Sequence, residues 1–269
     1  MQHVVQNPNY RDKQMRKICV LSSITFAVLM SSAATGQGMP PGALVNTIDC
    51  SLNDGVSMVQ AVEWARNLPR EEMQPNAEFY RENIIGRSSY KDDYDFRIAS
   101  YFSSYSQMVA TVGGNAALPA NRTRPVQRAT DLYTCDQATL RIVTSRPIPG
   151  GDAFTGPLTL MSGFFCRIND DSNLGDVWEA LLAVNDNYAD EGESSLVQMI
   201  STTFGPVQNR GNGDFVGIAV IPATPEAWGA RRDMPRNGFS PFEGVELPMS
   251  CNFPSLWLTH AVYRAAPPQ

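Results

Sequence analysis

The sequence predicts an α+β protein built from two tandem βαββαβ repeats, and three observations in the 269-residue chain support this fold class. A five-residue motif of cysteine, any residue, leucine or isoleucine, asparagine and aspartate occurs at residues 50–54 and again at residues 166–170. A second cysteine follows each motif cysteine after 85 residues, Cys135 in the first copy and Cys251 in the second. The same order of strand and helix signals follows both copies.

The first repeat is expected to run strand, helix, strand, strand, helix, strand. The predicted segments are residues 44–50, 58–68, 77–85, 95–102, 104–112 and 139–144. Apolar residues recur at helical spacing in the first helix, which Pro69 ends, and Gly113-Gly114 should stop the second. The polar residues 87–93 are expected to form a hairpin loop.

The second repeat has the same order. Its predicted segments are residues 158–166, 174–182, 196–204, 214–221, 225–231 and 256–263. Asn212-Gly213 is a strong hairpin-turn signal between its two central strands. Gly86 and Gly205 align at an offset of 119 residues, close to the offset of 116 between the motif copies. The proline- and glycine-rich residues 147–151 mark the boundary between the repeats.

The N-terminal segment resembles a secretory signal. Met15-Arg16-Lys17 supplies a short positive region, residues 18–30 are apolar, and residues 31–34 are small. The apolar run is shorter than the roughly 20 residues that a membrane span needs. We expect residues 1–36 to be a leader whose true start is Met15, followed by repeats at 37–150 and 151–269. The protein would then be exported to the periplasm or the extracellular space, without a membrane anchor after cleavage.

The order of elements is that of the ferredoxin-like motif, whose sheet order is 4-1-3-2. In that order the end of strand 1 lies beside the start of strand 4, where the paired cysteines fall. Removal of the leader would leave four cysteines in an oxidising compartment, and four cysteines allow three pairings. The repeat favours one disulfide in each half, Cys50 with Cys135 and Cys166 with Cys251.

The duplication, the element order and the motif together resemble the dimeric α/β-barrel superfamily in its tandem fused form, over about residues 43–265. The motif turn is similar to one in uncharacterised secreted proteins of marine bacteria. The resemblance implies that two antiparallel sheets pack as a pseudo-dimeric α/β barrel with helices outside. Members of the superfamily include cofactor-free monooxygenases, haem-dependent chlorite- and peroxide-processing enzymes, and stress-response proteins.

Few residues suggest chemistry. The Asn-Asp pairs of the two motif copies are expected to form turns and helix caps. Residues 169–173 and 186–193 are acidic but lack the pattern of an EF-hand calcium loop. No Cys-x-x-Cys pair, glycine-rich phosphate loop or Gly-x-Ser-x-Gly elbow occurs, so a metal site is not expected and the catalytic residues stay unknown.

His260 is the one histidine after the leader. The resemblance makes it a candidate haem ligand, although a half-buried structural histidine is the more conservative interpretation. Aromatic residues are numerous on the strands and helices and could line a pocket for a small apolar ligand between the sheets. They are Phe79, Tyr80, Tyr101, Phe102, Phe164, Phe165, Trp178, Phe215 and Trp257.

The formal net charge is −6, and no basic patch is present, so nucleic acid is not an expected partner. Because no catalytic constellation stands out, the sequence favours a non-catalytic module that binds a small ligand or a partner protein. The alternative is a dimeric α/β-barrel-type enzyme, either a cofactor-free monooxygenase or a haem-dependent oxidoreductase. The sequence leaves the ligand, the cofactor and the oligomeric state open.

Overall fold

The computed structural model describes residues 39–68, 75–86, 94–116, 128–205 and 214–265. The chain from Pro40 onward is one compact unit. The predicted leader, the loop at 87–93 and the turn at Asn212-Gly213 lie outside the described residues. None of the helices in the described ranges is long and apolar enough to cross a membrane.

Within those ranges the chain forms nine strands and five helices. The strands are β1 (Ala43–Leu52), β2 (Ala77–Ile85), β3 (Phe96–Phe102), β4 (Tyr133–Pro147), β5 (Leu158–Ile168), β6 (Leu196–Phe204), β7 (Phe215–Ile221), β8 (Met249–Cys251) and β9 (Ser255–Arg264). The helices are α2 (Met58–Arg66), α3 (Tyr105–Ala116), α4 (Ala129–Leu132), α5 (Leu174–Asp190) and α6 (Pro225–Arg236). The prediction that Gly113-Gly114 stops a helix is wrong, because α3 continues through both glycines.

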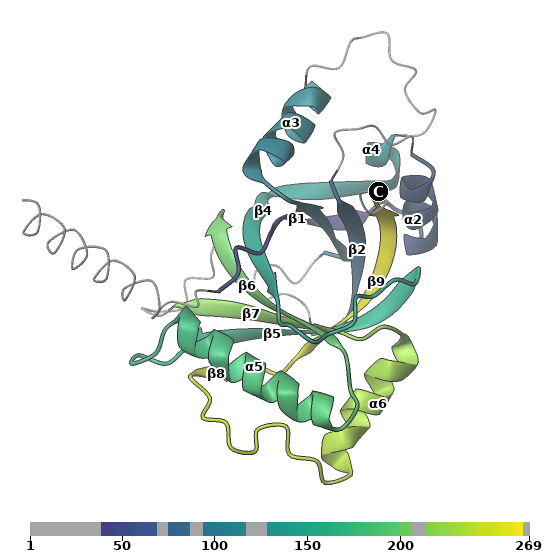
Figure 1. The fold of residues 1–269 in the computed structure, drawn as a ribbon. Coiled ribbons are helices and arrows are strands. Elements are labelled where there is room, and N and C mark those ends of the chain that lie inside the picture. The colour runs from purple at the N-terminus through teal and green to yellow at the C-terminus, as the bar shows by residue number, and fades with distance from the viewer. Residues whose placement is uncertain (1–38, 69–74, 87–93, 117–127, 206–213, 266–269) are drawn as a thin grey trace, which may run out of the picture. The chain divides into compact units, whose positions relative to one another are not determined.

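Eight strands close into an antiparallel barrel. Their hydrogen-bonded order is β7-β6-β4-β1-β3-β2-β9-β5, and β5 pairs back onto β7. The short β8 pairs with β5 beyond the end of β9, so β8 and β9 behave as one interrupted strand. Figure 1 shows α2, α3 and α4 on one side of this barrel and α5 and α6 on the other. The fold is therefore α+β with a closed barrel, which leaves no free sheet edge among these eight strands.

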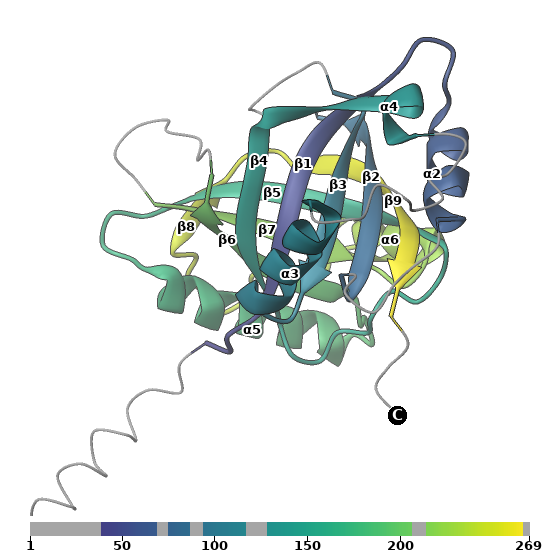
Figure 2. The ribbon, with the colours of Figure 1, turned by 90° about the horizontal axis from the view of Figure 1, so that it is seen from above.

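Strands from the two halves of the chain meet at two places in the barrel wall. The first half has the order β4-β1-β3-β2, and the second half continues as β9-β5-β7-β6. The second strand of each half pairs with the last strand of the other, β2 with β9 and β4 with β6. We call these pairings the β2–β9 seam and the β4–β6 seam, and the strands of the first half can be followed across the front of Figure 2.

Both copies of the repeated motif fix the turn after the first strand of their half. The amide nitrogen of Asn53 donates to the Thr130 carbonyl at 2.9 Å, and that of Asn169 donates to the Leu247 carbonyl at 3.2 Å. The aspartate of the second copy, Asp170, is 82% exposed and pairs only with neighbouring Arg167 in the described part of the chain. The motif is therefore a structural turn.

The helices start where side chains satisfy their free backbone amides. Ser57 caps α2, with Gln60 completing a capping box. Asn173 caps α5, so the caps of α2 and α5 lie three residues beyond the Asn-Asp pairs that were expected to supply them. Thr224 caps α6, which has Pro225 in its first turn. These caps fix the positions at which the helices begin to cover the barrel.

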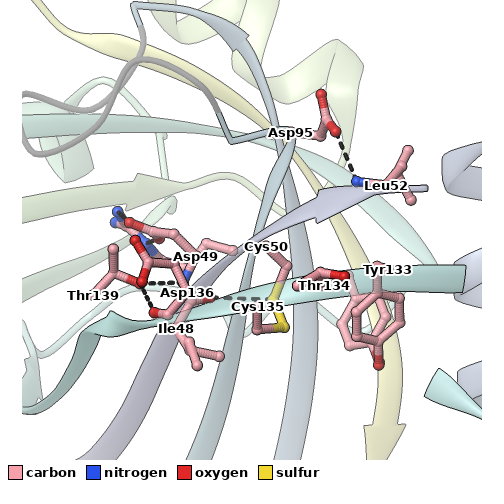
Figure 3. The surroundings of a disulfide bond; sticks show 12 residues. Ile48, Asp49, Cys50, Leu52, Asp95, Tyr133, Thr134, Cys135, Asp136 and Thr139 are labelled. Carbon is pink, nitrogen blue, oxygen red and sulfur yellow. Dashed lines mark hydrogen bonds and ion pairs between the residues drawn. A yellow bond between two sulfur atoms is a disulfide. The ribbon is translucent and has the colours of Figure 1, made fainter. Parts of the chain in front are cut away.

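Both predicted disulfides are present. Cys50 is bonded to Cys135, and Cys166 to Cys251, each pair lying directly opposite on neighbouring strands. Figure 3 shows the first of them between β1 and β4, with Tyr133 close by. Disulfides persist in oxidising environments, so the two bonds indicate a non-cytoplasmic compartment.

Each strand of the barrel has an outer face under the helices and an inner face towards the barrel axis. Outer residues such as Cys50, Tyr80 and Phe96 pack against Ala61 and Val62 of α2. A separate cluster fills part of the interior and joins both halves of the chain. Its buried members are Tyr94, Phe154, Met161, Ala219, Ile221, Trp257 and Ala261.

Gly205 directly follows β6 and lies against β4 of the first half. Replacing Gly205 tests how closely the two strands approach. Its φ is +100°, and an added Cβ would lie 2.6 Å from the Leu140 carbonyl oxygen. Gly192 also has a positive φ, +79°, but an added Cβ would meet no atom within 4 Å. We expect Gly192→Ala to cost about 1 kcal/mol and Gly205→Ala about 2 kcal/mol more, measured by urea unfolding. Equal costs would show that the approach of β6 to β4 is looser than described.

Candidate functional site inside the barrel

His260, the residue proposed from the sequence as a cofactor ligand, lies on the outer face of β9. It is paired across the β2–β9 seam with Tyr80, which packs in the outer cluster beneath α2. Its Nε2 lies 3.3 Å from Glu82 Oε2, and its side chain is 13% exposed. His260 therefore faces away from the barrel interior, and its role as a ligand stays a prediction.

The predicted aromatic lining is divided between the two faces. Phe79 and Trp257 contribute to the interior cluster, and Tyr101 borders a second inner cluster around Val45. Tyr80 and Phe102 lie in clusters of the outer face. Only part of the aromatic set can therefore contact a ligand within the barrel.

A buried ion pair lies on the inner face of β1 and β3. Arg97 Nε lies 2.6 Å from Asp49 Oδ1, and the Asp49 side chain is 0% exposed. The Arg97 guanidinium also lies over the rings of Tyr94 and Trp257, which stack on each other. Asp49 is thus occupied by Arg97 and is not a free base.

A series of side-chain hydrogen bonds crosses the interior from one half of the protein to the other. Arg81 on β2 donates through Nη2 to the Tyr101 hydroxyl at 2.7 Å. Tyr101 in turn donates to Gln198 Oε1 at 3.2 Å. Gln198 belongs to β6, so this series links strand 2 of the first half to strand 2 of the second half.

Several buried polar atoms of inward-facing residues have no hydrogen-bond partner within the described residues. They are Thr47 Oγ1, Arg81 Nε, both side-chain polar atoms of Asn83, Ser145 Oγ and Thr259 Oγ1. Buried polar atoms are nearly always hydrogen-bonded in folded proteins, and each exception calls for an explanation. Three of these residues, Arg81, Asn83 and Thr259, are neighbours in the β2–β9 register.

Another buried guanidinium, outside the barrel, has a carboxylate partner and serves as a comparison for Arg81. Arg231 of α6 forms an ion pair with Glu193 and lies over the Tyr188 ring, 3.5 Å from its centroid. Desolvation lowers the pKa of Arg231 to about 10, so the group still carries its charge at neutral pH. Glu193 balances that charge, which makes the Arg231 cluster structural.

The interior site does not fit a haem. His260 lies on the opposite face of β9 from the unpartnered polar atoms, so it cannot present a ring nitrogen to a group bound among them. All four cysteines of the described part of the chain are disulfide-bonded. Among the described residues, the interior site therefore offers neither a histidine nor a free cysteine as an axial ligand to haem iron.

No protein-family model matches the chain, and a search of curated proteins found no match. Solved structures that resemble it include a candidate monooxygenase from Fusobacterium nucleatum, 9% identical, covering 84% of this chain and 94% of that one at a TM-score of 0.45. An anthrone oxidase-like protein is 12% identical, with coverages of 84% and 97% and a TM-score of 0.42. A candidate chlorite dismutase is 12% identical, with coverages of 82% and 95% and a TM-score of 0.43.

The prediction of a non-catalytic binding module is corrected by these comparisons. The similar structures also include a dye-decolorizing peroxidase and an aldoxime dehydratase, so all carry enzyme or enzyme-like descriptions. They agree with the dimeric α/β-barrel resemblance at the level of a closed antiparallel barrel. At these identities and TM-scores the likeness assigns no activity or substrate to this chain.

The sequence did not point to Arg81, Asn83 and Thr259. Arg81 lies in the middle of a correctly predicted strand, two residues after Phe79 and two before Asn83. The alternation of side chains placed Arg81 and Asn83 on one face of β2, but nothing in the sequence identified that face as the interior or brought Thr259 of β9 next to it. Closure of the barrel at the β2–β9 seam is what buries them.

Proposed function

We propose that the protein is an enzyme of the dimeric α/β-barrel type that oxidises a small organic substrate with dioxygen, without a bound cofactor, inside the barrel. The observation that carries the proposal is the Arg81 guanidinium. It is 6% exposed, faces the interior, and has no carboxylate partner among the described residues. Preorganised positive charge in a water-excluded site stabilises an anion that forms during a reaction.

The chemistry that this environment supports begins with a carbon acid. A guanidinium beside the forming enolate lowers the pKa of the adjacent C–H bond, which makes the carbanion accessible. The carbanion can then donate electrons to dioxygen, and the proton that leaves the carbon passes to water and is balanced by the H₂O that is formed. Overall, CH₂ and O₂ give C=O and H₂O, so that one oxygen atom enters the substrate, the other leaves as water, and the substrate supplies all the electrons.

The chain's own residues have separate parts in this scheme. Arg81 would contact the enolate oxygen, and Tyr101 and Gln198 would hold the guanidinium in place through their hydrogen bonds. The Asp49–Arg97 pair and the stacked rings of Tyr94 and Trp257 would exclude water from one side of the site. Excluding water strengthens each electrostatic contact within the site.

Oxygen uptake with a panel of enolisable aromatic ketones and arylacetic acids tests the proposed function. We expect wild type to consume dioxygen with at least one of these substrates and to release no hydrogen peroxide. Arg81→Met should lower kcat/KM by about 100-fold or more, as the loss of an oxyanion donor does in other enzymes. The matched control is Arg236→Met, because Arg236 is 81% exposed on α6. An equal effect of both substitutions, or no uptake at all, would refute the assignment.

We also propose that the two halves are tandem ferredoxin-like repeats, at residues 37–150 and 151–269, and that the protein is exported. The strand order of each half and the equivalent disulfides support the first statement. The basic and apolar residues 15–34 support the second. The mature N-terminus should fall between residues 33 and 37, and N-terminal sequencing that found an uncleaved chain in an exporting host would refute export.

A further inference from the structure

We infer that the inner face of the β2–β9 seam binds the carboxylate group of a small organic acid through Arg81, Asn83 and Thr259. The inference rests on the proposed function and names the substrate class of the same interior site: an organic acid whose α-carbon forms the enolate, so that the enolate oxygen contacted by Arg81 is an oxygen of the bound carboxyl group. The sequence predicted a small apolar ligand. The inference adds that this ligand carries a carboxylate group at one end.

The first argument is charge. A buried guanidinium without a counter-charge is strongly unfavourable, and buried arginines are normally paired with carboxylates. Asp49 is already paired with Arg97, and Arg231 has Glu193. Arg81 has only the neutral Tyr101 hydroxyl, and its Nε donor is unpartnered within the described ranges. A ligand carboxylate would provide the missing charge, in the geometry that guanidinium groups favour.

The second argument is the position of the neighbouring groups. Thr259 lies directly opposite Arg81 across the seam, and Asn83 lies opposite Trp257. Directly opposed side chains in antiparallel strands start about 5 Å apart, and residues two apart along a strand share a face. Thr259, with its unpartnered hydroxyl, and Asn83, with its unpartnered amide, therefore occupy the positions next to Arg81 on the same inner face. Together they offer three hydrogen-bond donors to one oxoanion.

The third argument is the difference between the two seams. At an offset of 119 residues, the position of Arg81 corresponds to Ile200, which pairs with Ser145 in the β4–β6 seam. Ile200 packs against the inner cluster of Val45 and Val143. The same place in the barrel thus accepts an aliphatic residue in one seam and holds a charged one in the other. Barrel closure therefore does not require a charge at this position, and Arg81 uses only Nη2 in the hydrogen-bond chain to Tyr101 and Gln198, which leaves its Nε for a ligand.

The fourth argument is the apolar surroundings. Phe79 lies two residues before Arg81 on β2, and Ala261 lies two residues after Thr259 on β9. Both belong to the interior cluster that includes Trp257. A ligand with its carboxylate at Arg81 would place its body against these side chains. This arrangement favours an aromatic or branched apolar acid over a small inorganic anion.

Calorimetric titration with benzoate, and with benzamide as a neutral ligand of nearly the same shape, tests the inference. We expect wild type to bind benzoate at least about tenfold more tightly than benzamide. Arg81→Met should weaken benzoate binding about 30-fold or more and abolish the preference, whereas the surface control Arg236→Met should change neither. Equal binding of both ligands by wild type, or no binding of benzoate, would overturn the inference.

Thr259→Val provides a second test that remains valid if the Arg81→Met variant does not fold. Thr259 is 1% exposed and its hydroxyl is unpartnered, so the isosteric valine should leave the unfolding midpoint unchanged or raise it. Benzoate binding should nevertheless weaken about tenfold. A stable variant that binds benzoate as wild type does would overturn the role of Thr259. Because the titration needs no turnover, carboxylate binding without oxygen uptake would refute the oxygenase proposal alone.

Discussion

Removing the Cys50–Cys135 disulfide by Cys50→Ser/Cys135→Ser should cost about 4 kcal/mol of unfolding free energy. The bond closes a loop of 85 residues, and in the chain-entropy model a loop of this length contributes roughly that amount. The bond also joins β1 to β4 beside the outer cluster that holds Tyr80 and Phe96. Urea unfolding of the double variant, beside wild type under non-reducing conditions, measures the cost.

The second disulfide gives the matched comparison. Cys166–Cys251 closes a loop of the same 85 residues but attaches only the three-residue β8 to β5. Equal losses would show that chain entropy dominates. A larger loss in the first half would indicate that the outer cluster beneath α2 depends on its disulfide. A loss below about 1 kcal/mol for both bonds would contradict the view that they stabilise the barrel.

Breaking the buried ion pair inside the barrel should have an effect of similar size. Asp49→Ala removes a carboxylate with no exposed surface and leaves the 18% exposed Arg97 guanidinium without it. Loss of one partner from a buried pair costs about 3–5 kcal/mol. We expect the lower end, about 3 kcal/mol, because Arg97 keeps its contact with the Tyr94 hydroxyl and its partial exposure.

Two controls separate this cost from simple loss of charge. Asp233→Ala removes a carboxylate that is 62% exposed and 3.7 Å from Arg236, and should change stability by less than about 0.5 kcal/mol. Asp49→Leu/Arg97→Met removes both charges and should recover most of the lost stability. If Asp49→Ala costs as little unfolding free energy as Asp233→Ala, water reaches the charged groups inside the barrel. The Arg81 guanidinium would then be solvated and would not need a ligand carboxylate.

The architecture could be predicted from the sequence because its signals are local or repeated. The alternation of apolar residues located the strands, and β2 and β6 begin and end where they were predicted. The equal cysteine spacing predicted both disulfides. The prediction missed most of β4, which runs from Tyr133 to Pro147, because a register shift opposite Thr47 and Asp49 breaks its alternation.

The candidate site could not be predicted, because it is created by pairing between segments far apart in the chain. Arg81 and Thr259 are ordinary strand residues until β2 and β9 lie side by side. His260 attracted attention through its rarity, but its register places it on the outer face. A local pattern can say that two residues share a face, whereas the identity of that face depends on how the barrel closes.

The most direct test of the interior site is a crystal structure with 4-bromobenzoate, with data collected at the bromine absorption edge. The anomalous signal locates the ligand independently of any assumption about the side chains. We predict a bromine peak inside the barrel and a carboxylate within hydrogen-bond distance of Arg81 Nε and the Thr259 hydroxyl. A peak confined to the outer face near His260, or an interior with only water at Arg81, would contradict the account.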